Sequence, residues 1–86
     1  MENQDIPKTR EEILSMALDA RIQEVMHYQI NIDNYTLALQ VIANLPYSER
    51  EELSAFETQL QELLASEKLE QKKAKIMLSV IESQVK

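Results

Sequence analysis

The chain has 86 residues, of which 15 are acidic and 9 are basic, so its formal net charge is -6. It contains no cysteine, no glycine and a single histidine, which excludes disulfides, cysteine-ligated zinc, histidine-rich metal sites and glycine-rich phosphate loops. The acidic balance also disfavours non-specific binding to nucleic acids or anionic membranes.

A domain of this length buries only a modest fraction of its surface, and without a disulfide or a metal its remaining source of added stability is oligomerisation. No apolar run approaches the roughly 18 residues that would span a bilayer. The first residues, Met-Glu-Asn-Gln-Asp, lack the basic and apolar segments of a signal peptide. We therefore expect a cytoplasmic protein with no cofactor and no bound metal.

Residues 1–8 form a polar lead-in, and the single domain predicted for residues 9–86 begins after it. Thr9 and Glu12 have the spacing of a capping box, which predicts a helix start. From there apolar and aromatic residues recur at alternating steps of four and three, the pattern of a helix seam. The seam positions are Leu14, Leu18, Arg21, Val25, Tyr28, Ile32, Tyr35, Leu39 and Ile42.

We interpret residues 9–45 as one helical arm, because the seam keeps its phase throughout. The stretch Ile30–Tyr35 has low helix propensity, so a break into two helices is the alternative. Further apolar residues flank the seam and widen it beyond a narrow coiled-coil stripe. They are Ile13, Ala17, Ile22, Met26, Ile30, Leu37, Ala38, Val41 and Leu45.

The first arm ends at an elbow, residues 46–48, because Pro46 disfavours helical geometry at the residue before it. Ser48 and Glu51 have the spacing of a second capping box, which predicts a second helix over residues 49–85. Its apolar stripe is interrupted by residues 66–75, which are charged almost all round and indicate a solvated or rim-facing segment, or a bend. The stripe consists of Leu53, Phe56, Leu60, Leu63, Leu64, Leu69, Ala74, Ile76, Met77, Val80, Ile81 and Val85.

These patterns predict an all-α fold: an antiparallel helical hairpin whose first arm is an N-terminal helix. A hairpin has one contact face per helix, so part of the apolar surface is left over. The surplus residues are Ile22, Met26, Ile30, Leu37 and Val41. We therefore expect assembly as a homo-oligomeric helical bundle.

Catalysis is not indicated, because neighbouring carboxylates on a helix do not face each other and general acid–base chemistry needs convergent groups. Glu24 and His27 approach the Glu-x-x-His pattern of di-iron sites, but such a site needs the motif from two helices and two further glutamates. A homodimer could supply two copies of the motif, although a single histidine is more often a surface or interface residue. We therefore expect a protein that is not an enzyme.

The first arm carries the side chains best suited to hold a nucleotide. Tyr28 and Tyr35 lie one heptad apart on the seam and serve either as interface contacts or as stacking surfaces for bases. Arg21 interrupts the seam and needs an anion, either a carboxylate of a neighbouring chain or a ligand phosphate. The candidate ligand-binding residues are Lys8, Arg10, Arg21, His27, Tyr28 and Tyr35.

Each candidate also has a purely structural interpretation. Lys8 and Arg10 bracket the first helix start, where free amides favour anions, but solvated surface charges are the commoner outcome. The run Lys68, Lys72, Lys73 and Lys75 is interleaved with acidic residues, so a solvated face is favoured over a nucleic-acid groove.

A polar lead-in, a helix through His27–Tyr35, the elbow Leu45-Pro46-Tyr47-Ser48 and one long closing helix follow in this order. In this architecture the chain resembles the phage anti-CBASS cyclic-nucleotide sponges, small hairpin proteins of tailed phages, and in particular their T-even type. The resemblance implies a homo-hexamer of short-plus-long helices in the host cytoplasm. It also implies immune evasion: cyclic dinucleotides such as cGAMP are held between protomers, and cyclic trinucleotides in separate pockets, without cleavage.

The preferred hypothesis is therefore a cyclic-nucleotide sponge that binds no membrane and no DNA or RNA polymer. The alternative is an acidic helical adaptor or inhibitor that binds a host protein through a helix face. A hairpin-dimer RNA regulator that uses the lysines is a third hypothesis.

Overall fold

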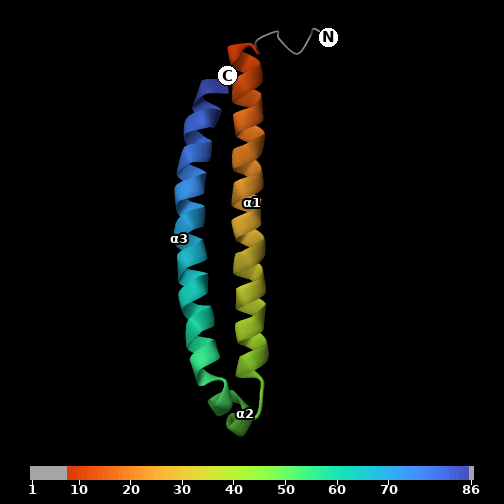
Figure 1. Cartoon of the computed structure of the whole chain (residues 1–86), viewed down its shortest axis with the longest axis vertical. Helices are drawn as coiled ribbons and strands as arrows, with labels where there is room; N and C mark the ends of the chain where they lie inside the picture. Colours follow the sequence, from red (N-terminus) through yellow and green to blue (C-terminus); the bar gives the residue numbers. More distant parts are fainter. Residues whose placement is uncertain (1–7, 86) are drawn as a thin grey trace.

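The computed structural model describes residues 8–85, which form two long helices and a short one (Figure 1). α1 (Arg10–Ala43) and α3 (Ser54–Val85) lie side by side and antiparallel, and α2 (Tyr47–Glu52) lies at the turn that joins them. Residues 8–85 contain no strand, so the prediction of an all-α fold is confirmed. Of the predicted polar lead-in, only Lys8 lies inside the described range.

The two arms are nearly equal, with 34 residues in α1 and 32 in α3. This differs from the pairing of short with long helices that the family resemblance implies. The protein is 65 Å along its longest axis and 16 Å along its shortest, little more than the diameter of a single helix with its side chains, about 10–12 Å. A single layer of helices therefore makes up the whole fold.

α1 begins at the predicted capping box. The Glu12 amide donates to Thr9 Oγ1 at 3.2 Å, and the Thr9 amide donates back to the Glu12 carboxylate at 2.8 Å. The helix then continues through Ile30–Tyr35, so the alternative of two helices is wrong. Ile32 explains the continuity, because it is only 8% exposed and its burial outweighs the low helix propensity of the stretch around it.

The predicted seam of α1 is the face that meets α3. All nine of its positions are buried or half-buried, and Ile42 is 4% exposed. On α3 the facing positions also alternate by three and four and are likewise buried or half-buried: Glu57, Leu60, Leu64, Glu67, Gln71, Ala74, Leu78 and Ile81. Two heptad seams packed antiparallel are therefore the core of the protein.

Residues 66–75 are not bent and not wholly solvated, because one side of the helix in this segment is buried or half-buried and the other is exposed. Gln71 and Ala74 are 8% and 3% exposed, and the helix runs through the segment. The side-chain amide of Gln71 donates from Nε2 to the backbone carbonyl of Val25 at 3.2 Å and to Gln29 Oε1 at 2.9 Å. This buried polar group is tolerated because α1 supplies its acceptors.

Glu67, on the same seam, accepts a hydrogen bond from the side-chain amide of Asn31 at 2.7 Å. Other residues of the predicted α3 stripe instead face solvent, since a heptad seam uses only two of every seven positions. Those more than half exposed are Leu69 and Ile76.

The predicted elbow is also corrected. α1 ends at Ala43, Pro46 occupies the N-cap of α2, and no side chain caps that helix. Ser48 cannot act as a cap because it lies within α2, whereas a cap residue needs an extended backbone. The second arm is not continuous from residue 49 but breaks at Leu53, whose amide donates to the Arg50 carbonyl at 3.1 Å.

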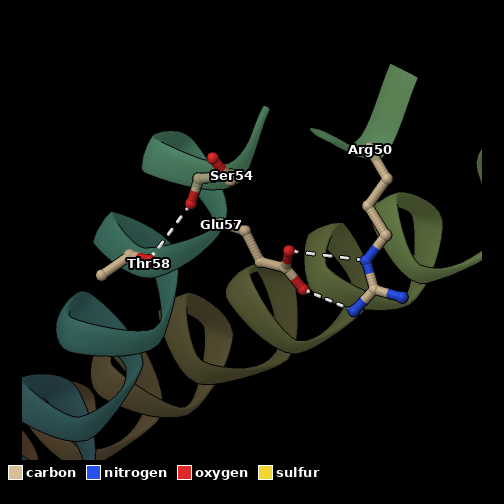
Figure 2. A network of polar contacts seen from close by, with 4 residues as sticks. All are labelled: Arg50, Ser54, Glu57 and Thr58. Atoms are coloured by element: carbon tan, nitrogen blue, oxygen red, sulfur yellow. Dashed lines mark hydrogen bonds and ion pairs between the residues drawn. The ribbon is translucent and has the colours of Figure 1, made fainter. Parts of the chain in front are cut away.

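An ion pair spans this break, as Figure 2 shows. Arg50 Nη2 donates to Glu57 Oε2 at 2.9 Å, and Arg50 Nε lies 3.5 Å from Glu57 Oε1. The hydrogen bond and the charge of Glu57 raise the pKa of Arg50 above its ordinary value. The pair connects α2 to the first turns of α3, where Thr58 Oγ1 also donates to the Ser54 carbonyl at 3.1 Å.

Thr9, which caps α1, and Ser48, which caps no helix, should respond differently to replacement by alanine. Thr9→Ala should lower the free energy of unfolding by about 0.5–2 kcal/mol, because it removes an acceptor of the α1 N-terminus. Ser48→Ala should change it by less than about 0.5 kcal/mol, as at an ordinary surface position. Urea unfolding followed by circular dichroism measures both values, and equal losses for the two variants would contradict the cap assignment.

The Gln71 contacts predict a cost for losing this side chain. Gln71→Ala should lower the free energy of unfolding by about 1–3 kcal/mol, since two hydrogen bonds across the seam disappear. Gln61→Ala, an exposed position on the same helix, is the matched control and should have little effect. An equal response of both variants to urea would show that the Gln71 contacts do not contribute to stability.

Candidate ligand-binding site

The six candidate residues do not converge within one hairpin. Arg21, Tyr28 and Tyr35 lie half-buried on the seam, whereas His27 is exposed on the outer side of α1. Lys8 and Arg10 are exposed at the open end of the hairpin. Arg10 and Tyr35 are separated by about 37 Å along the axis at 1.5 Å per residue. One chain alone therefore presents these groups along a line and not around a ligand.

Arg21 forms an ion pair with a carboxylate on its own helix. Its guanidinium donates to Glu24 Oε1 at 2.9 Å, and each of the two side chains is 37% exposed. The sequence had left open a carboxylate of a neighbouring chain or a phosphate, and the structure supplies a carboxylate of the same chain. Because water screens the pair, it contributes at most about 1 kcal/mol, so an incoming phosphate could compete for Arg21.

Tyr28 is in contact with the ring of His27. The ring centroids are 6.2 Å apart and the planes are inclined by 61°, an edge-to-face arrangement. A base cannot be held between rings that are so far from parallel, so it could stack only on an outer face of the pair. The pair extends from the half-buried seam to the exposed side of α1.

Arg10 lines a small cavity at the open end of the hairpin. Its guanidinium donates to Gln84 Oε1 at 3.3 Å, which links the start of α1 to the end of α3. The cavity has a volume of about 120 Å³, and its lining residues are Arg10, Glu11, Leu14, Gln84 and Val85. Pockets that enclose drug-sized ligands measure about 300–1,000 Å³. A cyclic dinucleotide therefore does not fit inside this cavity.

The remaining charged groups of residues 8–85 form no concentrated site. The four lysines of α3 are all exposed, and Lys73 pairs with Glu70 at 3.0 Å. Within the described part of the chain no three side chains of the metal-binding types are grouped closely enough to hold a metal ion. Glu24 and His27 accordingly have no further ligand beside them there.

One feature of α1 was only partly recognised from the sequence. A second series of positions alternates by three and four on the side of α1 away from the seam, and every member is exposed. We call this series the outer stripe: Ile13, Met16, Ala20, Gln23, His27, Ile30, Asn34, Leu37 and Val41. Ile30, Leu37 and Val41 belong to the surplus apolar surface predicted from the sequence, and the heptad spacing of the whole series is the signal that identifies the stripe.

Comparison of the chain with protein-family models, with curated proteins and with solved structures found no match. The resemblance to the cyclic-nucleotide sponges therefore remains a prediction from the order of the sequence elements. Among residues 8–85, no helix is long and apolar enough to cross a membrane.

Proposed function

We propose that this protein sequesters cyclic oligonucleotides in sites formed between copies of the hairpin and releases them chemically unchanged. The ligands are cyclic dinucleotides such as cGAMP, and also cyclic trinucleotides. Removing these messengers from solution blocks the CBASS immune response to phage infection. The observation that supports the proposal is the series of cations and tyrosines along α1, which a single hairpin spreads over about 37 Å and does not bring together.

The chemistry of a cyclic dinucleotide accounts for the residues involved. It carries two phosphates, which the field of an acidic protein repels, so local cations from more than one chain are needed to hold them. Arg10 and Arg21 are basic residues of the first arm, and Lys8 lies directly before it. The outer face of the His27–Tyr28 pair provides an aromatic surface for a base. Assembly would bring together groups that a single hairpin keeps apart.

Sequestration requires binding alone. Each messenger molecule that is bound lowers the concentration of free messenger. Binding also stabilises the folded protein by mass action. The residues of the site need only pair with phosphates and stack on bases, and no bond of the ligand is broken.

A second function is favoured by the outer stripe. An exposed helix face with apolar residues at heptad spacing is a surface on which another helix can pack, so an acidic adaptor or inhibitor of a host protein is the alternative. This alternative needs no nucleotide, and a ligand titration distinguishes the two functions.

Replacing Lys8 and residues of α1 tests the proposal. Arg21→Ala, Lys8→Ala and Tyr28→Ala should each weaken cyclic-dinucleotide binding by roughly 1–3 kcal/mol, because each removes a phosphate or base contact. Lys72→Ala and Lys73→Ala on α3 are matched controls and should bind like the parent. Isothermal titration with a panel of cyclic di- and trinucleotides gives the affinities, and light scattering confirms that each variant is still assembled.

Two results would contradict the proposal. The first is a panel in which no cyclic oligonucleotide binds the assembled parent or raises its melting temperature, which would favour the adaptor. The second is unchanged affinity in all three variants at Lys8, Arg21 and Tyr28. Mass spectrometry of the released ligand adds a further criterion, since a cleaved product would indicate a phosphodiesterase.

A further inference from the structure

We infer that the outer stripe of α1 is a self-association surface. It pairs with the outer stripe of a second copy of this chain, antiparallel, in the register that places Gln23 opposite Asn34 of the partner. This goes beyond the proposed function and does not depend on any ligand.

The outer stripe leaves large apolar side chains in water. Ile13, Met16 and Ile30 are 55%, 56% and 56% exposed, and Leu37 and Val41 are 57% and 63% exposed. The stripe extends over about four heptads, which is the length at which a heptad pattern indicates a coiled coil. The seam already occupies the other side of the helix, so α3 of the same chain cannot cover the outer stripe. A second helix packed on this face would remove these side chains from water.

A two-fold symmetric pair requires each contact to occur twice, so the stripe must complement its own reverse. One antiparallel register pairs amide with amide, two large apolar side chains with each other, and a small side chain with a large one, while its His27 layer sets a polar ring against an apolar side chain. Its layers are Met16 with Val41, Ala20 with Leu37, Gln23 with Asn34, and His27 with Ile30. The amides of Gln23 and Asn34 can then hydrogen-bond across the interface.

The neighbouring antiparallel register, one heptad away, also has one mismatched layer. It sets Met16 against the amide of Asn34 and Gln23 against His27. An apolar residue then covers a polar one, which costs free energy when the amide loses its water contacts. The His27–Ile30 layer of the first register has a similar cost, so the residues of the stripe do not distinguish the two registers and the charges beside it must.

Charges beside the stripe favour the first register. The flanking pairs it creates are Asp19 with Gln40, Met26 with Asp33, Glu24 with Asn31, and Ala17 with Ala38. None of these pairs joins two like charges. This is significant in a chain with a net charge of -6, because like charges that face each other across helices are destabilising.

Both competing arrangements bring carboxylates together. The neighbouring antiparallel register sets Asp19 against Asp33 and places Glu24 opposite its own copy. A parallel pair sets Asp19 beside Glu24 of the second chain. The second copy is the occupant that this self-complementary pattern fits, since an unrelated helix would require no such symmetry in the stripe.

Disulfide trapping tests the register in the full chain, which has no cysteine of its own. Gln23→Cys and Asn34→Cys should be refolded together and oxidised gently. In the inferred register each thiol faces the other across one layer, near the short separation that a disulfide needs. The same residue in two chains lies about 16 Å apart along the axis, so neither variant alone should cross-link. Covalent dimers should therefore form rapidly in the mixture only.

Other cross-linking patterns would overturn the inference. Preferential trapping of Gln23→Cys with His27→Cys indicates the neighbouring register, and trapping of Gln23→Cys with itself indicates a parallel pair. Trapping of none of these combinations, with folded protein shown by circular dichroism, means that the stripe does not pair with itself. The result is separate from the nucleotide titration, because the hairpins could cross-link as inferred and still bind no ligand.

Sedimentation equilibrium gives an independent measurement of the interface. Leu37→Glu should weaken self-association at least about tenfold, since it buries a charge against the apolar layer of Ala20. Ile76→Glu is the matched control, because Ile76 is equally apolar, 64% exposed and on α3 outside the stripe. A parent that is monomeric at micromolar concentration, or a Leu37→Glu variant that associates like the control, would contradict the inference.

Discussion

The seam between α1 and α3 is the contact on which the described part of this protein depends. A hairpin of two helices has no second layer, and none of the described side chains is less than 2% exposed. Ile32, Ile42, Leu60 and Ala74 are its buried apolar residues. Because apolar burial is so limited, polar contacts across the seam help to fix the register of α1 against α3. Gln71 has its two acceptors on α1, and a slip of one helix past the other would leave that amide buried without them.

Features that depend on near neighbours in the sequence were predicted well. Thr9 and Glu12 form the expected capping box, and the alternation of four and three identified the face of α1 that packs on α3. Ser48 failed as a cap because Pro46, two residues earlier, already begins the turn into α2. The burial of Gln71 was missed for a different reason: its acceptors lie 42 and 46 residues away in the sequence. The charges near Gln71 in the sequence therefore could not reveal these acceptors.

The candidate site was less predictable than the fold. Heptad spacing places Arg21, Tyr28 and Tyr35 on one side of α1, and the structure agrees. Residues one heptad apart on a straight helix are nevertheless about 10 Å apart, so a shared face does not make a site. Convergence of these groups requires other chains, whose arrangement depends on surfaces such as the outer stripe. The single sequence contains that information only as complementarity between the stripe and its own reverse.

The hairpin topology also sets the order in which the structure can form and open. Contacts near the elbow join residues close in sequence, whereas the Arg10–Gln84 hydrogen bond closes a loop of 74 residues. Loop closure costs more entropy as the loop lengthens, so folding proceeds most readily from the elbow toward the termini. Ile42 and Leu60, on the elbow side of the seam, are each 4% exposed, while Val85 at the other end is 45% exposed. We therefore expect fraying of the seam to begin at the end that carries Arg10.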